Sequence, residues 1–563
     1  MTTRRPQHAM FAVGLAALGC AAAAADVNTP SAQVDMRPGF SPPQRPDLFR
    51  LPPVEPDEPA APSVDQAAML HLQRVLFEGN TVVSTADLES VVVPQIDRDL
   101  GAADIEALRI ALTRVYVDRG YVNSGLRIRR VDVATGIIEF DVIEGRLVAI
   151  ELSGMERLDN DYVLAQLSRP DDGPFNLDRL RERFQLLLDD PLFERMNARL
   201  IPGQAPGDAV LAIDVKRARP YEIRLFANNY RPVSIGAASV GVSGLVRNLT
   251  GRGDLLEASL QAPAEGSDDL RGGLAWRMPL GQRGTQFLLA LDRGSSSVIE
   301  QSVRSLDIRS RLSSIELGVS QIVFESLTKK FSLGLQAVHR ENRTWLLGQP
   351  FSFNPGEPDG IVRENIARFS QELVWRSEKQ VLAFRSTFSW GQNNLQDVAG
   401  LPFQNRPPTH YRIWLGQAQI ARQLGSDGLQ FVARASLQHS PDRLLALDGI
   451  ALGGVNTVRG FRENQLVRDE GALLNLELEW PVVNQPENGL RVVFVPFYDI
   501  GRGRNHGDSA TTLQSLGVAT RVRWKNFNLD LTLAKRIDQP SATKNQGSNL
   551  QDQGVHLQLS RHF

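Results

Sequence analysis

The chain has little of what would place it in several common protein classes. Its 563 residues include one cysteine, so no disulfide framework can form. Lysine plus arginine (62) and aspartate plus glutamate (64) nearly balance, which argues against a nucleic-acid-binding protein. Past the N-terminus there is no apolar run of about 18 residues, and this excludes a helical membrane protein. A β-barrel membrane protein is not excluded, because alternating strands have a soluble-looking average hydropathy.

Sequence signatures of enzyme and cofactor sites are also missing. The eight histidines are scattered, and no His-Glu-x-x-His or Cys/His cluster predicts a metal site. No Gly-x-x-x-x-Gly-Lys-Ser/Thr loop is present to bind a nucleotide, and no Gly-x-Ser-x-Gly elbow is present to carry a nucleophile. We therefore expect no catalytic residue, no metal, no cofactor and no enzymatic activity.

The N-terminal part is predicted to be an export signal followed by an extended arm. Arg4 and Arg5 precede a short apolar run and an alanine-rich cleavage site, so residues 1–25 are interpreted as a signal peptide. Residues 26–70 contain ten prolines. This density disfavours helix and predicts an extended linker.

Residues 71–146 and 147–220 are predicted to form two small domains with the same order of elements, β-α-α-β-β. In the first, a strand ends at Gly79, and the segment that begins at Ser84 has the pattern of a helix N-terminus. Apolar residues at three- and four-residue steps then indicate a second helix that ends at Gly120. Two alternating strands follow, and the second domain repeats the order.

From residue 221 to residue 563 apolar and polar residues alternate. One segment illustrates the pattern, with apolar Leu474, Leu476, Leu478 and Trp480 set against polar Asn475, Glu477 and Glu479. A soluble β-sandwich also alternates, but full charges on the polar face and the lack of a long helical pattern favour a membrane barrel. At about 9–11 residues per strand, the region holds about sixteen strands. We therefore predict a multidomain protein with two α+β domains followed by a transmembrane antiparallel β-barrel.

The last segment, residues 555–563, alternates and ends on Phe563. It is similar to the C-terminal strand of outer-membrane barrels, whose final aromatic residue is recognised by the barrel assembly machinery. Arg561 departs from the pattern because it lies on the otherwise apolar face. Near the membrane interface such a charge costs only about 0–1 kcal/mol, so the barrel prediction stands.

Two motifs in this region suggest a loop held inside the barrel. A long loop contains Val458-Arg459-Gly460-Phe461, and Phe497-Tyr498-Asp499-Ile500-Gly501 follows one strand later. The guanidinium of Arg459 offers a rigid fork of donors that Asp499 can accept. Gly460 allows a tight turn, and Gly501 leaves room for the loop to approach the wall. We expect Phe461 to wedge against apolar wall groups such as Phe497.

The two motifs, in this order, resemble the signature of the outer-membrane translocase and assembly superfamily. Within it the chain resembles the TpsB-type two-partner secretion transporters of the haemolysin-activator kind (ShlB/FhaC/HecB). The N-terminal domains resemble POTRA domains at Phe77-Glu78-Gly79-Asn80, Arg119-Gly120-Tyr121 and Val142-Ile143-Glu144-Gly145. The resemblance implies that Arg459 and Asp499 form a loop–barrel pin, supported by Val458, Gly460, Phe461, Phe497 and Gly501.

The resemblance also implies a function. A transporter of this family would sit in the outer membrane of a Gram-negative bacterium, in contact with its lipid, with the POTRA domains in the periplasm. It would export a large partner protein whose N-terminal secretion domain binds the POTRA domains as an added strand. Its insertion would depend on the assembly machinery reading Phe563, and no nucleic acid or nucleotide is expected as a partner. Two alternatives are a factor that assembles other barrels, whose relatives usually carry three or more POTRA domains, and a passive solute channel.

Overall fold

The computed structural model describes most of the chain after the N-terminal arm. The described residues are 69–167, 173–265, 269–281, 284–301, 303–397, 406–425, 427–538 and 547–563. The predicted signal peptide and almost all of the predicted arm lie outside the described residues. The chain divides into two units: one ends at Pro220 and includes Gly251–Gly253, and the other comprises the remaining residues from Tyr221 to Phe563.

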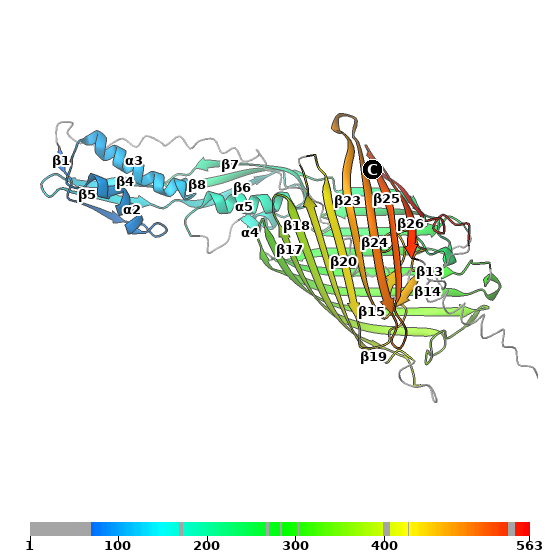
Figure 1. Cartoon of the computed structure of the whole chain (residues 1–563). Helices are drawn as coiled ribbons and strands as arrows, with labels where there is room; N and C mark the ends of the chain where they lie inside the picture. The colour runs from blue at the N-terminus through cyan, green and yellow to red at the C-terminus, as the bar shows by residue number, and fades with distance from the viewer. Residues whose placement is uncertain are drawn as a thin grey trace, which may run out of the picture. The chain divides into compact units, whose positions relative to one another are not determined.

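The first domain of the N-terminal unit has the predicted β-α-α-β-β order (Figure 1). Its strands form a three-stranded sheet in the order β2-β5-β4, in which β2 is parallel to β5. The two helices pack on this sheet through Leu88, Leu112 and Tyr116, which are fully buried. The bounds are β1 (Leu70–His71), β2 (Arg74–Glu78), α2 (Thr85–Val92), β3 (Asp99–Leu100), α3 (Ala102–Asp118), β4 (Gly125–Asp132) and β5 (Ile137–Ile143).

The residues that suggested a POTRA domain meet at one end of this sheet. Gly79 has φ +98°, and a Cβ there would lie 2.7 Å from the carbonyl oxygen of Val142. Beyond that turn the Glu144 carboxylate accepts the backbone N–H groups of Thr81 (2.6 Å) and Val82 (2.8 Å). The motifs at residues 77–80 and 142–145 therefore lie side by side and are joined by hydrogen bonds.

The second domain repeats the architecture with a sheet in the order β6-β8-β7. Its elements are β6 (Arg146–Ser153), α4 (Asn160–Leu167), α5 (Leu177–Leu188), β7 (Phe193–Pro202) and β8 (Asp208–Arg217). The turn after α3 binds the start of α5: the Leu177 N–H donates to the Gly120 carbonyl (2.8 Å), and the Asn176 amide donates to the Arg119 carbonyl (2.9 Å). Asn176 also caps α5, so this turn joins the two domains.

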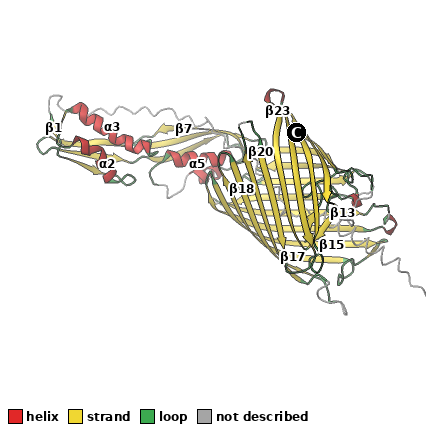
Figure 2. Ribbon diagram, in the orientation of Figure 1, coloured by secondary structure: helices red, strands yellow, loops and turns green. Residues whose placement is uncertain are grey.

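The C-terminal unit is a closed antiparallel barrel of sixteen long strands (Figures 1 and 2). The two-residue strand β16 (Gln349–Pro350) adds to the end of β15. The strands are β9 (Tyr221–Asn228), β10 (Ser239–Arg247), β11 (Leu255–Pro263), β12 (Arg271–Leu280), β13 (Thr285–Ser297), β14 (Arg309–Glu325), β15 (Lys329–Leu346), β17 (Ile361–Arg376), β18 (Gln380–Asn393), β19 (His410–Gln423), β20 (Gln430–His439), β23 (Glu470–Gln485), β24 (Leu490–Arg504), β25 (Thr511–Trp524), β26 (Phe527–Asp538) and β27 (Val555–His562).

The predicted alternation separates the two faces of the barrel wall. On β23, Leu474 and Trp480 are exposed on the outside, whereas Asn475 and Glu477 are buried on the inside. The prediction of a transmembrane-type barrel strand with one apolar and one polar face is thus confirmed for this segment. None of the helices in the described ranges is long and apolar enough to cross a membrane.

The barrel closes between its last and first strands, β27 and β9, which pair from Gln558 to His562. The backbone N–H of Phe563 donates to the Ile223 carbonyl (2.9 Å) beyond that pairing. The guanidinium carbon of Arg561 lies 5.0 Å from the ring centre of Phe527 and 4.6 Å from that of Phe563. Cation–π contacts with these two rings therefore stabilise the positive charge of Arg561 on the otherwise apolar face of the strand.

Candidate functional site

The long loop between β20 and β23, residues 440–469 (the lumen loop), folds back inside the barrel. It contains a short hairpin, β21 (Ile450–Leu452) and β22 (Leu466–Arg468). The tip of the hairpin carries Arg459 and Gly460. Gly460 has φ +89°, and a Cβ there would lie 2.8 Å from the Ala534 Cβ on β26, so the predicted need for glycine has a geometric basis.

The structure brings Arg459 and Asp499 together. The Arg459 Nε donates to Asp499 Oδ2 (2.7 Å), its Nη2 donates to Oδ1 (2.7 Å), and its backbone N–H also donates to Oδ2 (3.1 Å). Arg459 is 4% exposed and Asp499 is 0% exposed, so the ion pair is shielded from water. The geometry is the bidentate pairing that the residue types suggest. The role of this pin in transport stays a prediction.

A second carboxylate, Glu477 on β23, shares the arginine. The Arg459 Nη1 donates to Glu477 Oε1 (2.8 Å), and Arg434 (3.0 Å) and Arg521 (3.1 Å) contact the same carboxylate from β20 and β25. Asn475 completes the site by donating to Asp499 Oδ1 (2.8 Å). Sequence reasoning placed Glu477 and Asn475 on the polar face of their strand but assigned them no role at the pin.

Val458 and Phe461 lie in an apolar cluster between the loop and the wall, so Phe461 packs against apolar wall residues as expected, but Phe497 is not among them. The cluster consists of Ile450, Leu452, Val458, Phe461, Leu466, Leu473 and Leu513. Phe497 belongs to a separate cluster, and its ring lies flat under Arg459, with 3.5 Å between the guanidinium carbon and the ring centre. A Cβ at Gly501 would lie 2.8 Å from Val458 Cγ2, so this glycine leaves room for the loop as expected.

Strands β26 and β27 hold the other side of the tip. The backbone N–H of Gly460 donates to His556 Nε2 (3.1 Å), and Arg536 Nε donates to the Gly460 carbonyl (2.6 Å). Next to the tip, Arg462 forms a bidentate ion pair with Asp552 (2.6 and 2.9 Å). No local sequence pattern indicates these contacts, because the residues that form them are scattered singly along the chain.

The base of the lumen loop is fixed at a different part of the wall. Asp448 accepts from Arg340 Nη2 on β15 (2.6 Å), and Arg340 also donates to Glu364 on β17 (2.6 and 2.9 Å). The Tyr411 hydroxyl on β19 donates to the second oxygen of Glu364 (3.0 Å). The three charged side chains are almost fully buried. We call this group the base anchor; no sequence signal indicated it.

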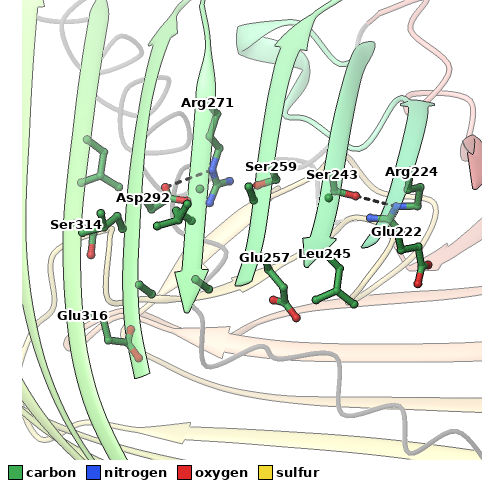
Figure 3. A pocket seen from close by; sticks show the side chains of 18 of the residues that line it. Glu222, Arg224, Ser243, Leu245, Glu257, Ser259, Arg271, Asp292, Ser314 and Glu316 are labelled. Atoms are coloured by element: carbon green, nitrogen blue, oxygen red, sulfur yellow. Dashed lines mark hydrogen bonds and ion pairs between the residues drawn. The ribbon is translucent and has the colours of Figure 1, made fainter. Parts of the chain in front are cut away.

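A cavity of about 490 Å³ opens on the inner face of the remaining strands (Figure 3). Its charged and polar lining comes from β9 to β14, with His562 from β27. Figure 3 labels Glu222, Arg224, Ser243, Leu245, Glu257, Ser259, Arg271, Asp292, Ser314 and Glu316. Among the described residues, no group of three or more His, Cys, Asp or Glu side chains is arranged to hold a metal ion.

Comparison with known proteins identifies the relatives of this architecture. The model of the haemolysin secretion/activation protein family ShlB/FhaC/HecB matches residues 207–524, and that of the ShlB-type POTRA domain matches residues 70–145. The outer membrane transporter CdiB of Dickeya dadantii is 22% identical over 476 residues, which cover 82% of each chain. The haemolysin transporter protein ShlB of Serratia marcescens is 29% identical over 188 residues, covering 32% of this chain and 31% of ShlB.

Solved structures agree at the level of the fold. The structure of CdiB from Escherichia coli superposes with a TM-score of 0.68 at 19% identity, covering 90% of this chain and 92% of that one. BamA from Haemophilus ducreyi lacking POTRA domains 1–3 gives a TM-score of 0.52 at 11% identity, covering 88% of this chain and 100% of that one. A POTRA module followed by this type of barrel is therefore a shared architecture.

Proposed function

The chain belongs to the family of haemolysin secretion/activation proteins ShlB/FhaC/HecB, and we propose that its POTRA domains bind the secreted partner while its barrel forms the passage. The chain is an outer-membrane transporter with its POTRA region in the periplasm, and it exports a partner protein to the cell surface by two-partner secretion. We propose that the partner threads through the barrel lumen and that the pinned lumen loop sets the shape of this passage. The single observation that carries this proposal is the buried Arg459–Asp499 pair inside a closed barrel.

The test is reconstituted secretion. The chain is co-expressed with a partner that carries an N-terminal secretion domain, and the partner outside the cells is measured with and without the transporter. We expect export only when the transporter is present. Export that is equal without it would refute the proposal. Passage of small solutes without any partner export would favour a passive channel instead.

The POTRA domains are proposed to bind the secretion domain of the partner as an added strand. The two three-stranded sheets have four edge strands in the described residues, β2, β4, β6 and β7, and of these four β2 alone pairs with its neighbour without a bulge. The Arg74 N–H donates to the Gly136 carbonyl (3.2 Å) toward β5. By alternation the backbone groups of Val75 and Phe77 point away from β5, toward a guest strand.

A photo-crosslinking residue in place of Leu76 on β2 tests this surface. Leu76 is 38% exposed, and Ile110 on helix α3 is a control position with 49% exposure. We expect the probe at position 76, and not the probe at position 110, to capture the secretion domain. Equal capture at both positions would argue against β2 as the docking edge.

Membership of this family also suggests how the barrel is inserted into the outer membrane and what surrounds it there. We propose that the assembly machinery reads the C-terminal strand and Phe563, and that outer-membrane lipid covers the exposed apolar side chains of the wall, such as Trp480. We also propose that the pore is not an enzyme, because the buried charged groups of the loop are joined to one another. An assembly factor for other barrels is the second candidate. Depleting the transporter would then lower the levels of unrelated barrels, whereas the secretion role predicts loss of one exported partner.

A further inference from the structure

Among the described residues, the lumen loop covers one side of the inner wall, and a cavity lies against the other side, which we call the open wall. The polar contacts of the loop reach the wall at Arg340 on β15, Glu477 on β23, Asp499 on β24, Arg536 on β26 and His556 on β27. The cavity lies against the remaining arc, from β9 to β14. The loop borders this cavity at Leu447, which packs on Leu312 of β14.

We propose that the lumen loop stays docked during secretion and that the partner passes as a single extended chain along the β9–β14 wall. This inference rests on the proposed function, because it assigns the route within the same pore. The wall from β9 to β14 is thus a binding surface for an unfolded polypeptide of mixed sequence.

The loop is suited to stay because separate charged contacts hold its tip and its base. At the tip, Arg459 bridges Asp499 and Glu477, and Arg462 pairs with Asp552. At the base, Asp448 joins Arg340. Loss of one contact leaves the others in place, so complete release requires the buried charges at both ends to separate together.

Charged side chains on the open wall form ion pairs or hydrogen bonds with other side chains of the wall. Arg271 lies 3.4 Å from Asp292, and Arg224 donates to Ser243 (3.2 Å), as Figure 3 shows. Glu257 lies 3.0 Å from Arg277. Such a wall attracts neither acidic nor basic segments strongly, because Arg271 and Glu257 each face an opposite charge on a neighbouring strand, and the Arg224 guanidinium is bound to a neutral hydroxyl. This suits the passage of a long chain of varied composition, whereas an uncompensated charge row would retain segments of the opposite sign.

The size of the cavity fits one extended strand. Strand spacings of about 4.8 Å within a sheet and about 10 Å between sheets give an extended chain a cross-section of roughly 50 Å². The 490 Å³ cavity then holds about 10 Å of such a chain, or about three residues. The small side chains of Ser259, Ala275 and Ala290, together with Gly273, leave space above this inner face.

Site-specific disulfide crosslinking tests the route. Single cysteines are placed on the open wall as Ser259→Cys or Ser314→Cys, and beneath the docked loop as Ser515→Cys or Thr532→Cys, where Ser515 is 0% and Thr532 is 5% exposed. The full-length transporter is co-expressed with a partner that carries cysteines along its length and a stably folded C-terminal domain, which stalls it in transit. The unchanged chain gives the background, because its one cysteine, Cys20, lies in the predicted signal peptide.

We expect crosslinks from positions 259 and 314 to exceed those from positions 515 and 532 by at least tenfold. Equal crosslinking beneath the loop would overturn the proposal, because it would mean that the loop leaves the wall. Absence of crosslinks at positions 259 and 314, while the unstalled partner is still exported, would also overturn it. Loss of export from the unchanged transporter would instead refute the proposed function, so the two failures are distinguishable.

Discussion

Replacing Arg459 with alanine tests the pin most directly. The substitution removes two side-chain hydrogen bonds to Asp499 and one to Glu477, and it exposes the ring of Phe497. The backbone N–H of residue 459 can still donate to Asp499 while the tip stays in place. Asp499 then keeps Asn475 as a partner, and Glu477 keeps Arg434 and Arg521. Asp499 is therefore the group that loses its compensating charge.

The structure sets the size of the expected effect. Removing one partner of a fully buried ion pair costs about 3–5 kcal/mol. The pair here is almost completely shielded from water, so solvent screening does not reduce this value. If this free energy is lost from the docking of the lumen loop against the wall, the ratio of undocked to docked loop rises roughly 10²- to 10⁴-fold. The barrel itself should stay folded, because its strand pairing is unchanged.

The assay is maleimide labelling of a Thr457→Cys reporter next to the pin. Thr457 is 6% exposed, and within the described part of the chain its hydroxyl forms no hydrogen bond, so the reporter itself removes none there. We expect Arg459→Ala to accelerate labelling and to impair secretion, with the heat-modifiable gel shift of a folded barrel retained. Arg434→Ala is the matched control, because it removes one of three cations from Glu477 and should change labelling less than tenfold. Unchanged labelling and wild-type secretion in Arg459→Ala would refute the reasoning.

Three further results are expected. Gly501→Leu should speed reporter labelling, because even a Cβ there would lie 2.8 Å from the lumen loop; an unchanged rate would contradict the close approach. Asp448→Asn should loosen the base anchor less than Arg459→Ala loosens the tip, because Arg340 keeps a second carboxylate, and hydrogen exchange of the loop would measure this. In the POTRA region, Arg119 lowers the pKa of the Asp87 carboxyl, so its contribution to stability is present above about pH 4 and is lost as the pH falls. Thermal unfolding of Asp87→Asn should lack that part of the pH dependence.

The barrel strands were predictable because the alternation of apolar and polar residues within each segment shows which side chains face outward and which face inward. A slip of one residue would move Leu474 to the inside and Glu477 to the outside, so the alternation excludes it. A slip of two residues keeps every face and changes every partner. The sequence therefore could not show that Arg434 pairs with Asn475 in the strand register, which places its guanidinium beside Glu477. Convergence of three arginines on one carboxylate depends on this register.

The path of the lumen loop was harder to predict than its motif. The Val-Arg-Gly-Phe and Phe-x-Asp-x-Gly residues indicated the Arg459–Asp499 contact through resemblance. The base anchor joins residues that are 108 positions apart in the chain, Arg340 and Asp448, and neither lies in a recognisable pattern. The same limit applies to the choice of wall residues that Phe461 packs against. After the positive φ of Gly460 the chain turns, and Phe461 enters the apolar cluster with Leu513 instead of facing Phe497.

The geometry of the pin explains why arginine is suited to this position and lysine is not. Nε and Nη2 together match the two oxygens of Asp499, while Nη1 reaches Glu477 in the same plane. The flat face of the guanidinium lies on Phe497. An ammonium group is a point charge that could satisfy one of these carboxylates but could not hold both at once while stacking on the ring. The pin therefore uses the edge and the face of one side chain together, and the two carboxylates and the aromatic ring lie at the positions that this shape requires.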